Sequence, residues 1–352
     1  MLDVFYKLMW FYFFFLFFII LLCGRYNIIQ GHYFIPKQTG YKISVLFIIF
    51  VTSFRFNIGY DWSSYLNFIY PTFNPLNINR LEPLDKLIIS CAGYLNQPLV
   101  MFSVYAIITY ANIGILIHKY SVSNFESLMI YVCLFYLTDL STIRQAIAVS
   151  VVFYGFTFIE QRKFLKYFLT CIVAVLFHKS AVIALLFYHL YYAKPMAIVF
   201  IMVSIYTGMK VVLPKILGSI LPLFMLYLEK GGIKDSSGSF QRLFYLILFI
   251  YVLVFHRKKT AGLVNICAVG VALPFVLGGH TGGRLAQYFL IYYCLLLPEC
   301  NKRFNINYRI LFMIPFYAYF FMYLIVSVTA NHSDEYVPFR WYFFEDLNQK
   351  LM

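Results

Sequence analysis

The sequence predicts an all-α fold, a polytopic membrane bundle of about 12 transmembrane helices within a range of roughly 10 to 14. The first observation behind this prediction is that 62% of the 352 residues are hydrophobic and only 12% are charged. A soluble domain of this length cannot bury that much apolar surface. The second is that apolar runs recur along the whole chain, separated by short basic clusters. Because no polar stretch is long enough for a soluble domain, we expect residues 1–352 to form one integral membrane domain.

The apolar runs define the expected spans in chain order. Judged by the ~20 residues that a helix needs to cross a bilayer, the spans are 8–23, 43–57, 98–117, 125–141, 143–160, 165–177, 180–193, 196–213, 241–256, 261–278, 284–297 and 309–328. No small-residue cleavage site follows the first run, so we expect it to be retained. Only a few polar residues interrupt the stretches 125–160 and 165–193, which predicts a helical hairpin or a broken helix in each.

The basic clusters set the expected orientation. They are 162–166, 257–259 and 302–309. Placing them in the cytoplasm, against anionic lipid headgroups, satisfies the positive-inside rule and lets the spans alternate throughout. Both termini then lie outside, as do two larger periplasmic loops, 58–97 and 214–240. We expect short interfacial helices in these loops, one of them at 84–96, and an aromatic tail at 334–341 that folds back onto the outer surface.

Composition also excludes several classes of protein. The net charge of +14 is distributed between apolar runs rather than gathered on a soluble face, so we expect membrane lipids and not nucleic acid as partners. The seven cysteines are scattered without a CxxC pair, which indicates neither a zinc site nor a disulfide framework. Asp61, Glu82 and Asp85 share one loop, but they lack the spacing of a metal site. We predict no metal and no cofactor.

Arg55 and Asp61 are the first polar residues that need an explanation. An ionisable group within the hydrocarbon costs at least ~2.5–3.5 kcal/mol on insertion scales, so it requires a partner or a function. Arg55 ends a span, and Asp61 follows a turn at Gly59. In one interpretation the two side chains pair and close the turn. In the other, Arg55 faces an anionic ligand while Asp61 accepts a proton or a sugar hydroxyl.

Arg144 and Gln145 lie where one span ends and the next begins. If residue 143 opens a helix, Arg144 lies at its N-terminus, where the backbone N–H groups already favour anions. Arginine and helix dipole together would suit a diphosphate. The alternative is an ion pair between Arg144 and Asp139 that locks the hairpin.

Two further polar segments interrupt the apolar pattern. His178, Lys179 and Ser180 lie together between two spans, which indicates a wet cavity in which a histidine acts as a base or binds a phosphate oxygen. Arg284 and Tyr288 are spaced i, i+4 after a glycine-rich turn, so they share one helix face. No GK[ST] sequence follows these glycines, which excludes a nucleotide-binding P-loop.

The expected topology brings these residues to one side of the membrane. Arg55, Asp61, Arg144, His178 and Arg284 all fall at the outer interface. The orientation rests on the basic clusters alone, so the common side of these five residues is an independent observation. Arginines at one level favour an anionic substrate that enters from the outer leaflet, such as a lipid-linked diphosphate.

The same motifs resemble a known family. The sequence is similar, from about residue 45 to 340, to EpsG/Wzy-type O-antigen and exopolysaccharide polymerases. The resemblance rests, in order, on Arg55-x-x-x-Gly59-x-Asp61-x-x-x-Tyr65, Glu82-Pro-Leu, Arg144-Gln145-x-x-Ala148, His178-Lys-Ser180 and Arg284-x-x-x-Tyr288. It implies a multi-pass glycosyltransferase of the bacterial inner membrane that acts in lipopolysaccharide or other surface polysaccharide biosynthesis.

The resemblance also implies a reaction and its partners. At a periplasmic active site, the growing glycan on undecaprenyl diphosphate is transferred onto a new lipid-linked repeat unit, without a nucleotide sugar. The repeat units are delivered by the flippase of the same pathway. A chain-length regulator of the Wzz type is the expected protein partner.

Catalytic roles follow as hypotheses. Arg144 and Arg284 would stabilise the diphosphate leaving group, and Asp61 or His178 would take the proton of the acceptor hydroxyl. Arg55 would orient Asp61 or bind the second lipid diphosphate. The remaining candidates for substrate binding are Tyr65, Glu82, Gln145, Ser180 and Tyr288.

Two other functions are compatible with such a chain, and a third is excluded by the length of a loop. A lipid-linked oligosaccharide flippase or transporter should place its charges along a path through the membrane rather than at one interface. A membrane O-acyltransferase should expose its histidine to acyl-CoA from the cytoplasm. An O-antigen ligase carries one very large periplasmic loop late in the chain, and 214–240 is too short for that.

Overall fold

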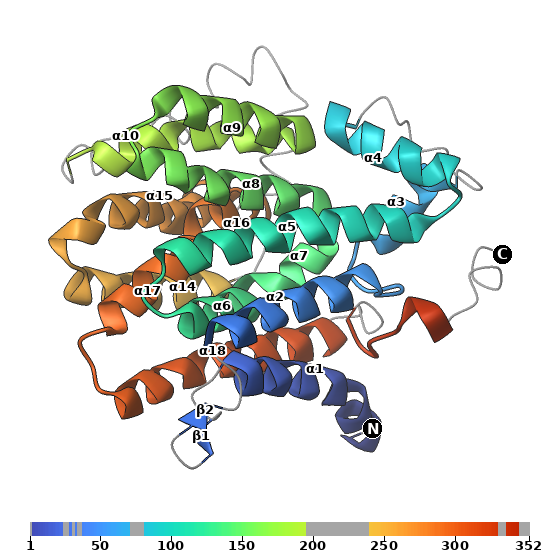
Figure 1. Ribbon diagram of the computed structural model, residues 1–352, viewed down its shortest axis with the longest axis horizontal. Helices are drawn as coiled ribbons and strands as arrows, with labels where there is room; N and C mark the ends of the chain where they lie inside the picture. The colour runs from blue at the N-terminus through green and yellow to red at the C-terminus, as the bar shows by residue number, and fades with distance from the viewer. Residues whose placement is uncertain are drawn as a thin grey trace.

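The fold is taken from a computed structural model of the chain (Figure 1). The structure describes residues 2–23, 28–29, 32–33, 37–70, 81–194, 239–329 and 336–344. The expected span 196–213 and the loop up to residue 238 therefore lie outside the described residues.

The first half of the chain forms a sequence of helices with one small hairpin. Its elements are α1 (Leu2–Cys23), β1 (Ile28–Ile29), β2 (His32–Tyr33), α2 (Lys37–Ser53), α3 (Trp62–Ile69), α4 (Pro83–Tyr94), α5 (Pro98–Tyr120), α6 (Asn124–Tyr131), the π-helical turn η2 (Val132–Tyr136), α7 (Leu137–Ser141) and α8 (Ile143–Glu160). The strands β1 and β2 pair antiparallel, with Ile28 opposite Tyr33.

The second half is helical throughout its described part. Its elements are α9 (Phe164–Phe177), η3 (Lys179–Leu186), α10 (Phe187–Tyr192), α14 (Ser239–Phe255), η5 (Lys258–Thr260), α15 (Ala261–Leu277), α16 (Gly279–Leu290), α17 (Tyr293–Asn301), α18 (Ile306–Thr329) and η6 (Tyr342–Phe344), of which η3, η5 and η6 are 3-10 turns. The predicted all-α class is confirmed, apart from the two-residue strands.

The number of membrane spans is confirmed only in part. Within the described residues, four helices are long and apolar enough to cross a bilayer: Pro98–Tyr120, Ile143–Glu160, Lys258–Leu277 and Ile306–Ser327. Four shorter apolar helices accompany them: Met9–Cys23, Gln38–Ser53, Phe164–Phe177 and Phe240–Phe255. The stretch 165–193 forms the expected hairpin, with η3 packed back against α9. The total of about 12 spans stays a prediction.

The distribution of apolar and polar side chains fits a bilayer environment. Large apolar groups such as Phe14 and Leu165 face outward, 62% and 68% exposed, where hydrocarbon would cover them. Several buried tyrosines donate their hydroxyl hydrogen to a backbone carbonyl. Tyr167, for example, donates to the carbonyl of Ala184 at 2.6 Å. Such a hydrogen bond lets a tyrosine pack between helices with its hydroxyl group paired.

The helices run side by side, so their connections gather at two ends of the bundle (Figure 1). One end, here called the α4 end, holds α3, α4, the α7–α8 junction and the start of α16. The other, the basic end, holds the connections around 120–124, 160–164, 255–261 and 301–306. The aromatic tail packs at the α4 end, as expected, and Trp341 forms a backbone bridge with Arg55.

A glycine turn closes the α4 end beneath the tail. Gly59 has φ +101°, a conformation that side chains disfavour. A Cβ at this position would lie 2.4 Å from the carbonyl oxygen of Leu140. The turn after α2 and the α7–α8 junction therefore approach as closely as they do because residue 59 has no side chain.

We expect Gly59→Ala to destabilise the protein. A left-handed backbone at a non-glycine residue costs about 1–2 kcal/mol, and overpacking adds about 1–3 kcal/mol. The matched control is Gly93→Ala, because a Cβ at Gly93 meets nothing within 4 Å. Thermal unfolding of both variants in detergent measures the effect. Equal melting temperatures would show that the turn does not depend on this glycine.

Candidate functional site

Glu82 joins three separate segments at the α4 end. It immediately precedes Pro83, the first residue of α4, a position in which proline favours the start of a helix. Its Oε2 lies 3.1 Å from Nη1 of Arg144 on α8. Its Oε1 lies 3.4 Å from Nδ1 of His178 and accepts the backbone N–H of Lys179 at 3.3 Å. Although burial raises its pKa, the Lys179 hydrogen bond and the Arg144 charge hold the pKa of Glu82 below its ordinary value.

Asp85 lies one helical turn further along α4 and is completely buried. Its Oδ1 accepts a hydrogen bond from the Tyr105 hydroxyl, and its Oδ2 lies 3.8 Å from Nη1 of Arg144. Oδ2 has no hydrogen-bond partner within the described structure. Burial raises the pKa of Asp85 to about 7, against the opposing effects of Tyr105 and Arg144. Arg144 is thus held between an ionised carboxylate and a carboxyl group that titrates near neutrality.

His178 is the third member of this cluster. It lies between α9 and η3, with Nδ1 directed to Glu82. Burial lowers its pKa, and the positive charges of Arg144 and Arg284 lower it further, which outweighs the raising effect of Glu82. The imidazole is therefore neutral at physiological pH and able to accept a proton.

Gln145 connects this cluster to α16. Its Nε2 donates to the carbonyl of Arg284 at 2.5 Å and to Oε1 of Gln287 at 3.0 Å. A second link joins the hydroxyl groups of Ser180 and Tyr288, 3.0 Å apart. These contacts join the first turns of α8 and η3 to the second half of α16, so the sequence motifs on these three elements form one cluster.

An open cavity of about 560 Å³ adjoins the cluster at α16, where Gln287 contacts both. Its lining is partly aromatic and is uncharged except for Arg284, whose exposed side chain faces it. The lining residues are Tyr60, Thr138, Phe240, Gln241, Gly279, Gly283, Arg284, Gln287, Tyr319, Met322, Tyr323 and Val326. Tyrosine rings and amides beside one guanidinium suit a ligand that combines sugar rings with phosphate.

Arg55 follows the end of α2, as the sequence predicted, but its side chain has neither of the predicted partners. It is 1% exposed and donates from Nη2 to the carbonyl of Leu140 at 2.9 Å, with its guanidinium 5.2 Å from the centre of the Phe102 ring. The expected pair with Asp61 is therefore wrong, and so is the interpretation in which Arg55 faces a ligand at the surface. Its charge lies inside the bundle, where it fixes the α7–α8 junction.

The alternative pair between Arg144 and Asp139 is also wrong. Asp139 is buried and accepts a hydrogen bond from the Tyr131 hydroxyl on the same run of helix, while Arg144 turns to Glu82. Thr142 separates the two residues with a non-helical backbone, which directs them to different neighbours.

Asp61 and Tyr65 lie at the edge of the cluster, on α3. Tyr65 is buried and interacts with the Arg144 guanidinium. Asp61 directly precedes α3, one turn before Tyr65, and is partly exposed. Of the two candidate bases, His178 is the one that contacts Glu82 and lies near both arginines.

The sequence pattern did not identify Asp85 and Tyr105 as members of the site. A signal was present, because Glu82 and Asp85 are spaced i, i+3 around Pro83 and so share one face at the start of a helix. Tyr105 lies on the next helix, and its contact with Asp85 depends on how α4 packs on α5. Within the described residues, no group of three or more His, Cys, Asp or Glu side chains has the geometry of a metal site.

These features define a multi-pass membrane protein with a cluster of ionisable groups and an adjoining cavity at one end of its bundle. The model of the EpsG family matches residues 40–341, and the chain belongs to that family. The match confirms the resemblance drawn from the motifs and associates the chain with membrane polysaccharide polymerisation. No curated protein and no solved structure matches it.

The raised pKa of Asp85 gives a testable dependence of stability on pH. The unfolded chain releases this proton near the ordinary value of 3.8, whereas the folded protein retains it to about 7. Because the folded state binds more protons in that window, its stability falls as pH rises from about 4 to 7. Asp85→Asn cannot titrate and keeps a polar group beside Tyr105.

We therefore expect the decline in melting temperature between pH 5 and pH 7.5 to be smaller in Asp85→Asn than in the native protein. Differential scanning fluorimetry in detergent over this pH range measures it. Lys86→Gln, the adjacent position on α4, is the control and should retain the native slope. Parallel pH profiles for all three proteins would contradict the assignment.

Proposed function

We propose that this protein is a polysaccharide polymerase, a glycosyltransferase that uses polyprenyl-diphosphate-linked donors at the α4 end of the bundle. The observation that carries the proposal is the convergence of Glu82, Arg144 and His178 beside a cavity that contains Arg284. A base next to an anion-binding arginine is what transfer from a diphosphate to a hydroxyl requires. Family membership supports the same class of reaction.

In the proposed reaction, His178 takes the proton of the acceptor hydroxyl as that oxygen attacks the anomeric carbon of the donor glycan. The new glycosidic C–O bond forms while the C–O bond to the diphosphate breaks, and the bonding electrons leave on the diphosphate. Arg284 and Arg144 stabilise the negative charge that develops there. Glu82 holds the imidazole through Nδ1, which leaves Nε2 for the proton.

The location and partners follow from this proposal. The α4 end faces the periplasm of a bacterial inner membrane, since the basic end then meets the cytoplasm. Undecaprenyl-diphosphate-linked repeat units are the substrates, supplied by the flippase of the pathway. A Wzz-type regulator sets the chain length.

The structure weighs against the two alternatives. A flippase should line a continuous path with charge, whereas Arg144, His178 and Arg284 lie at one end of the described bundle. An acyltransferase should expose His178 at the basic end, where cytoplasmic acyl-CoA would enter. His178 instead lies at the end opposite the basic clusters.

The first test removes the two arginines. We expect Arg144→Ala and Arg284→Ala each to reduce polymerisation by 10²-fold or more, because each removes charge stabilisation of the leaving group, a contribution of about 3–4 kcal/mol. The measurement is a surface polysaccharide ladder from cells that carry each variant in a deletion background. Loss of polymerase leaves single repeat units, loss of a flippase leaves none, and loss of an acyltransferase leaves a normal ladder.

Arg303→Gln is the matched control, because it removes an arginine at the basic end and should leave the ladder unchanged. Immunoblots of the membranes establish that each variant is present at native levels. Full-length polysaccharide in both Arg144→Ala and Arg284→Ala cells would show the proposed function to be wrong.

The second test concerns the base. Because the pKa of His178 is lowered, the rate should stay constant from pH 8 to pH 7 and decline only below the ordinary histidine value of 6.5. Glu82→Gln removes the interaction that raises this pKa, so the acidic limb should move to lower pH. It should also slow the reaction by about 10–100-fold, as loss of an orienting partner does.

The assay uses purified protein and lipid-linked repeat units extracted from a strain that lacks polymerase. His178→Gln should abolish the pH dependence together with most of the activity, and Asp61→Asn should retain both. An inactive Asp61→Asn beside an active His178→Gln would assign the base to Asp61 instead.

A further inference from the structure

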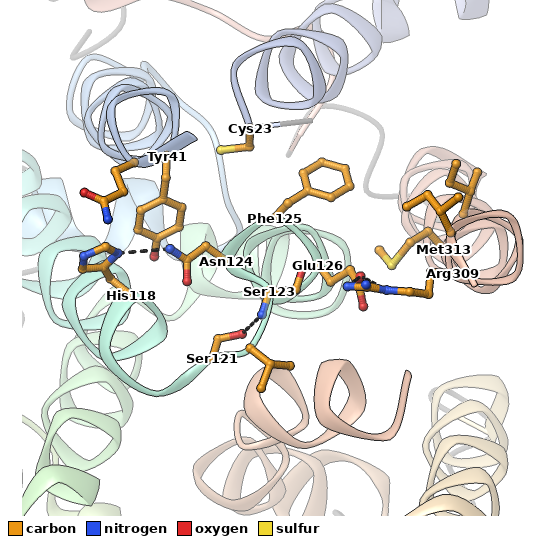
Figure 2. Close-up of a pocket in the computed structure, with 14 residues that line it drawn as sticks. Cys23, Tyr41, His118, Ser121, Ser123, Asn124, Phe125, Glu126, Arg309 and Met313 are labelled. Atoms are coloured by element: carbon orange, nitrogen blue, oxygen red, sulfur yellow. Dashed lines mark hydrogen bonds and ion pairs between the residues drawn. The ribbon is translucent and has the colours of Figure 1, made fainter. Parts of the chain in front are cut away.

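A second cavity, of about 550 Å³, lies at the basic end of the bundle. It lies among the ends of α1 and α5 and the beginnings of α2, α6 and α18, as Figure 2 shows. Its volume is in the range of small-molecule sites. None of its lining residues belongs to the cluster around Glu82 or to the cavity that contains Arg284.

The cavity contains one carboxylate, and that carboxylate already has an ion-pair partner. Glu126 is the one acid among its 14 lining residues. Nε of Arg309 donates to its Oε1 at 2.7 Å, Nη2 of Arg309 contacts the same oxygen, and Nδ2 of Asn301 lies 3.5 Å from Oε2. Arg309 therefore neutralises this carboxylate through Nε and Nη2, and its guanidinium has further N–H donors.

Hydrogen-bonding groups face Arg309 from the opposite wall (Figure 2). His118, in the last turn of α5, lies 3.0 Å through Nδ1 from Nδ2 of Asn124, the first residue of α6. The hydroxyl of Ser121 accepts the backbone N–H of Ser123 between them. Guanidinium, imidazole, amide and hydroxyl groups around one space are the groups that bind phosphate oxygens.

The net charge of the basic end favours the binding of an anion in this cavity. Its described acids are all engaged, since Glu126 binds Arg309, Glu299 binds Arg257 and Lys259, and Glu160 accepts from Tyr191. The basic residues outnumber them; they also include Lys119, Arg162, Lys163, Lys166, Lys258, Lys302 and Arg303. A net positive surface beside a membrane concentrates anionic headgroups.

One wall of the cavity is apolar and continues along α18. Ile306, Ile310 and Met313 are spaced i, i+4, i+7 and so form a stripe that faces the cavity. Ile310 is 49% exposed although it lies within a helix that is apolar enough to span the membrane. A polar pocket with an apolar wall matches a ligand that has a charged head and a hydrocarbon tail.

We propose that this cavity binds an anionic phospholipid of the adjacent leaflet. Its phosphate lies between Arg309 and the pair His118–Asn124, and one acyl chain lies along Ile310 and Met313. This lipid site is separate from the catalytic cluster and does not depend on the proposed reaction.

The test uses the purified full-length protein, stripped of lipid in detergent, and dihexanoyl phosphatidylglycerol as the probe. We expect one bound lipid by native mass spectrometry and a rise in melting temperature. Inorganic phosphate and dihexanoylglycerol should give neither. If phosphate alone stabilises equally, the site is a free-anion site, and if dihexanoylglycerol does, it is only an apolar groove. Either result overturns the proposal.

Variants then locate the site. Ile310→Trp fills the cavity without a change of charge, and His118→Gln combined with Asn124→Ala removes headgroup contacts. Each should weaken binding at least tenfold. Ile314→Trp adds the same ring one turn along α18, outside the cavity lining, and should bind normally. Equal affinity for Ile310→Trp and Ile314→Trp would show that the lipid binds elsewhere on the bundle.

Glu126→Gln combined with Arg309→Gln removes the ion pair without leaving a buried charge unpaired. It should also lose the bound lipid while the protein remains folded, as its elution in size-exclusion chromatography would show. Retention of the lipid by this double variant would contradict the role of Arg309.

Discussion

The ion pair between Glu82 and Arg144 is the interaction on which the α4 end depends. A partly buried pair of this kind offsets the cost of desolvation only when further hydrogen bonds satisfy its remaining atoms. Here the second carboxylate oxygen faces His178 and the Lys179 backbone, so one carboxylate fixes the α9–η3 junction as well. This carboxylate therefore fixes three segments relative to one another: the start of α4, the first turn of α8 and the junction between α9 and η3. Loss of either charge would remove the strongest interaction of its partner in a low-dielectric setting.

A set of contacts between the turn after α2, the α7–α8 junction and the tail supports this pair. Gly59 allows the turn after α2 to contact Leu140, and the same carbonyl accepts the guanidinium of Arg55. The tail joins these contacts where Tyr336 bonds to Ser141 at 2.6 Å. Arg144 begins the next helix only a few residues later, so these contacts determine where its side chain starts. Residues far apart in the sequence thus set the position of the arginine that contacts Glu82.

Part of this arrangement could be predicted from the sequence, and the physical reasons for the rest are specific. Apolar runs predicted the helices, because burial in a bilayer requires continuous apolar segments. The polar segments around residues 144, 178 and 284 were expected to lie together because polar groups between spans need partners, whereas Glu82 was indicated by the family resemblance alone. The partner of Arg55 could not be predicted in this way. Its acceptor is a backbone carbonyl, and because every residue has one, no sequence motif marks it. Asp85 was not identified for a similar reason, because its partner Tyr105 lies in an ordinary apolar helix.

The structure also places His178 and Arg284 in different surroundings, which the sequence motifs alone could not show. His178 is directed by Glu82, whereas Arg284 projects into the cavity beyond α16, with Gln145 bonded to the backbone between them. Arg284 is nevertheless close enough to lower the pKa of His178. A diphosphate bound at Arg284 would add negative charge near the imidazole and raise that pKa. In the proposed reaction, binding of the donor would therefore make His178 a stronger base when the acceptor hydroxyl must lose its proton, which would couple diphosphate binding at Arg284 to proton transfer at His178.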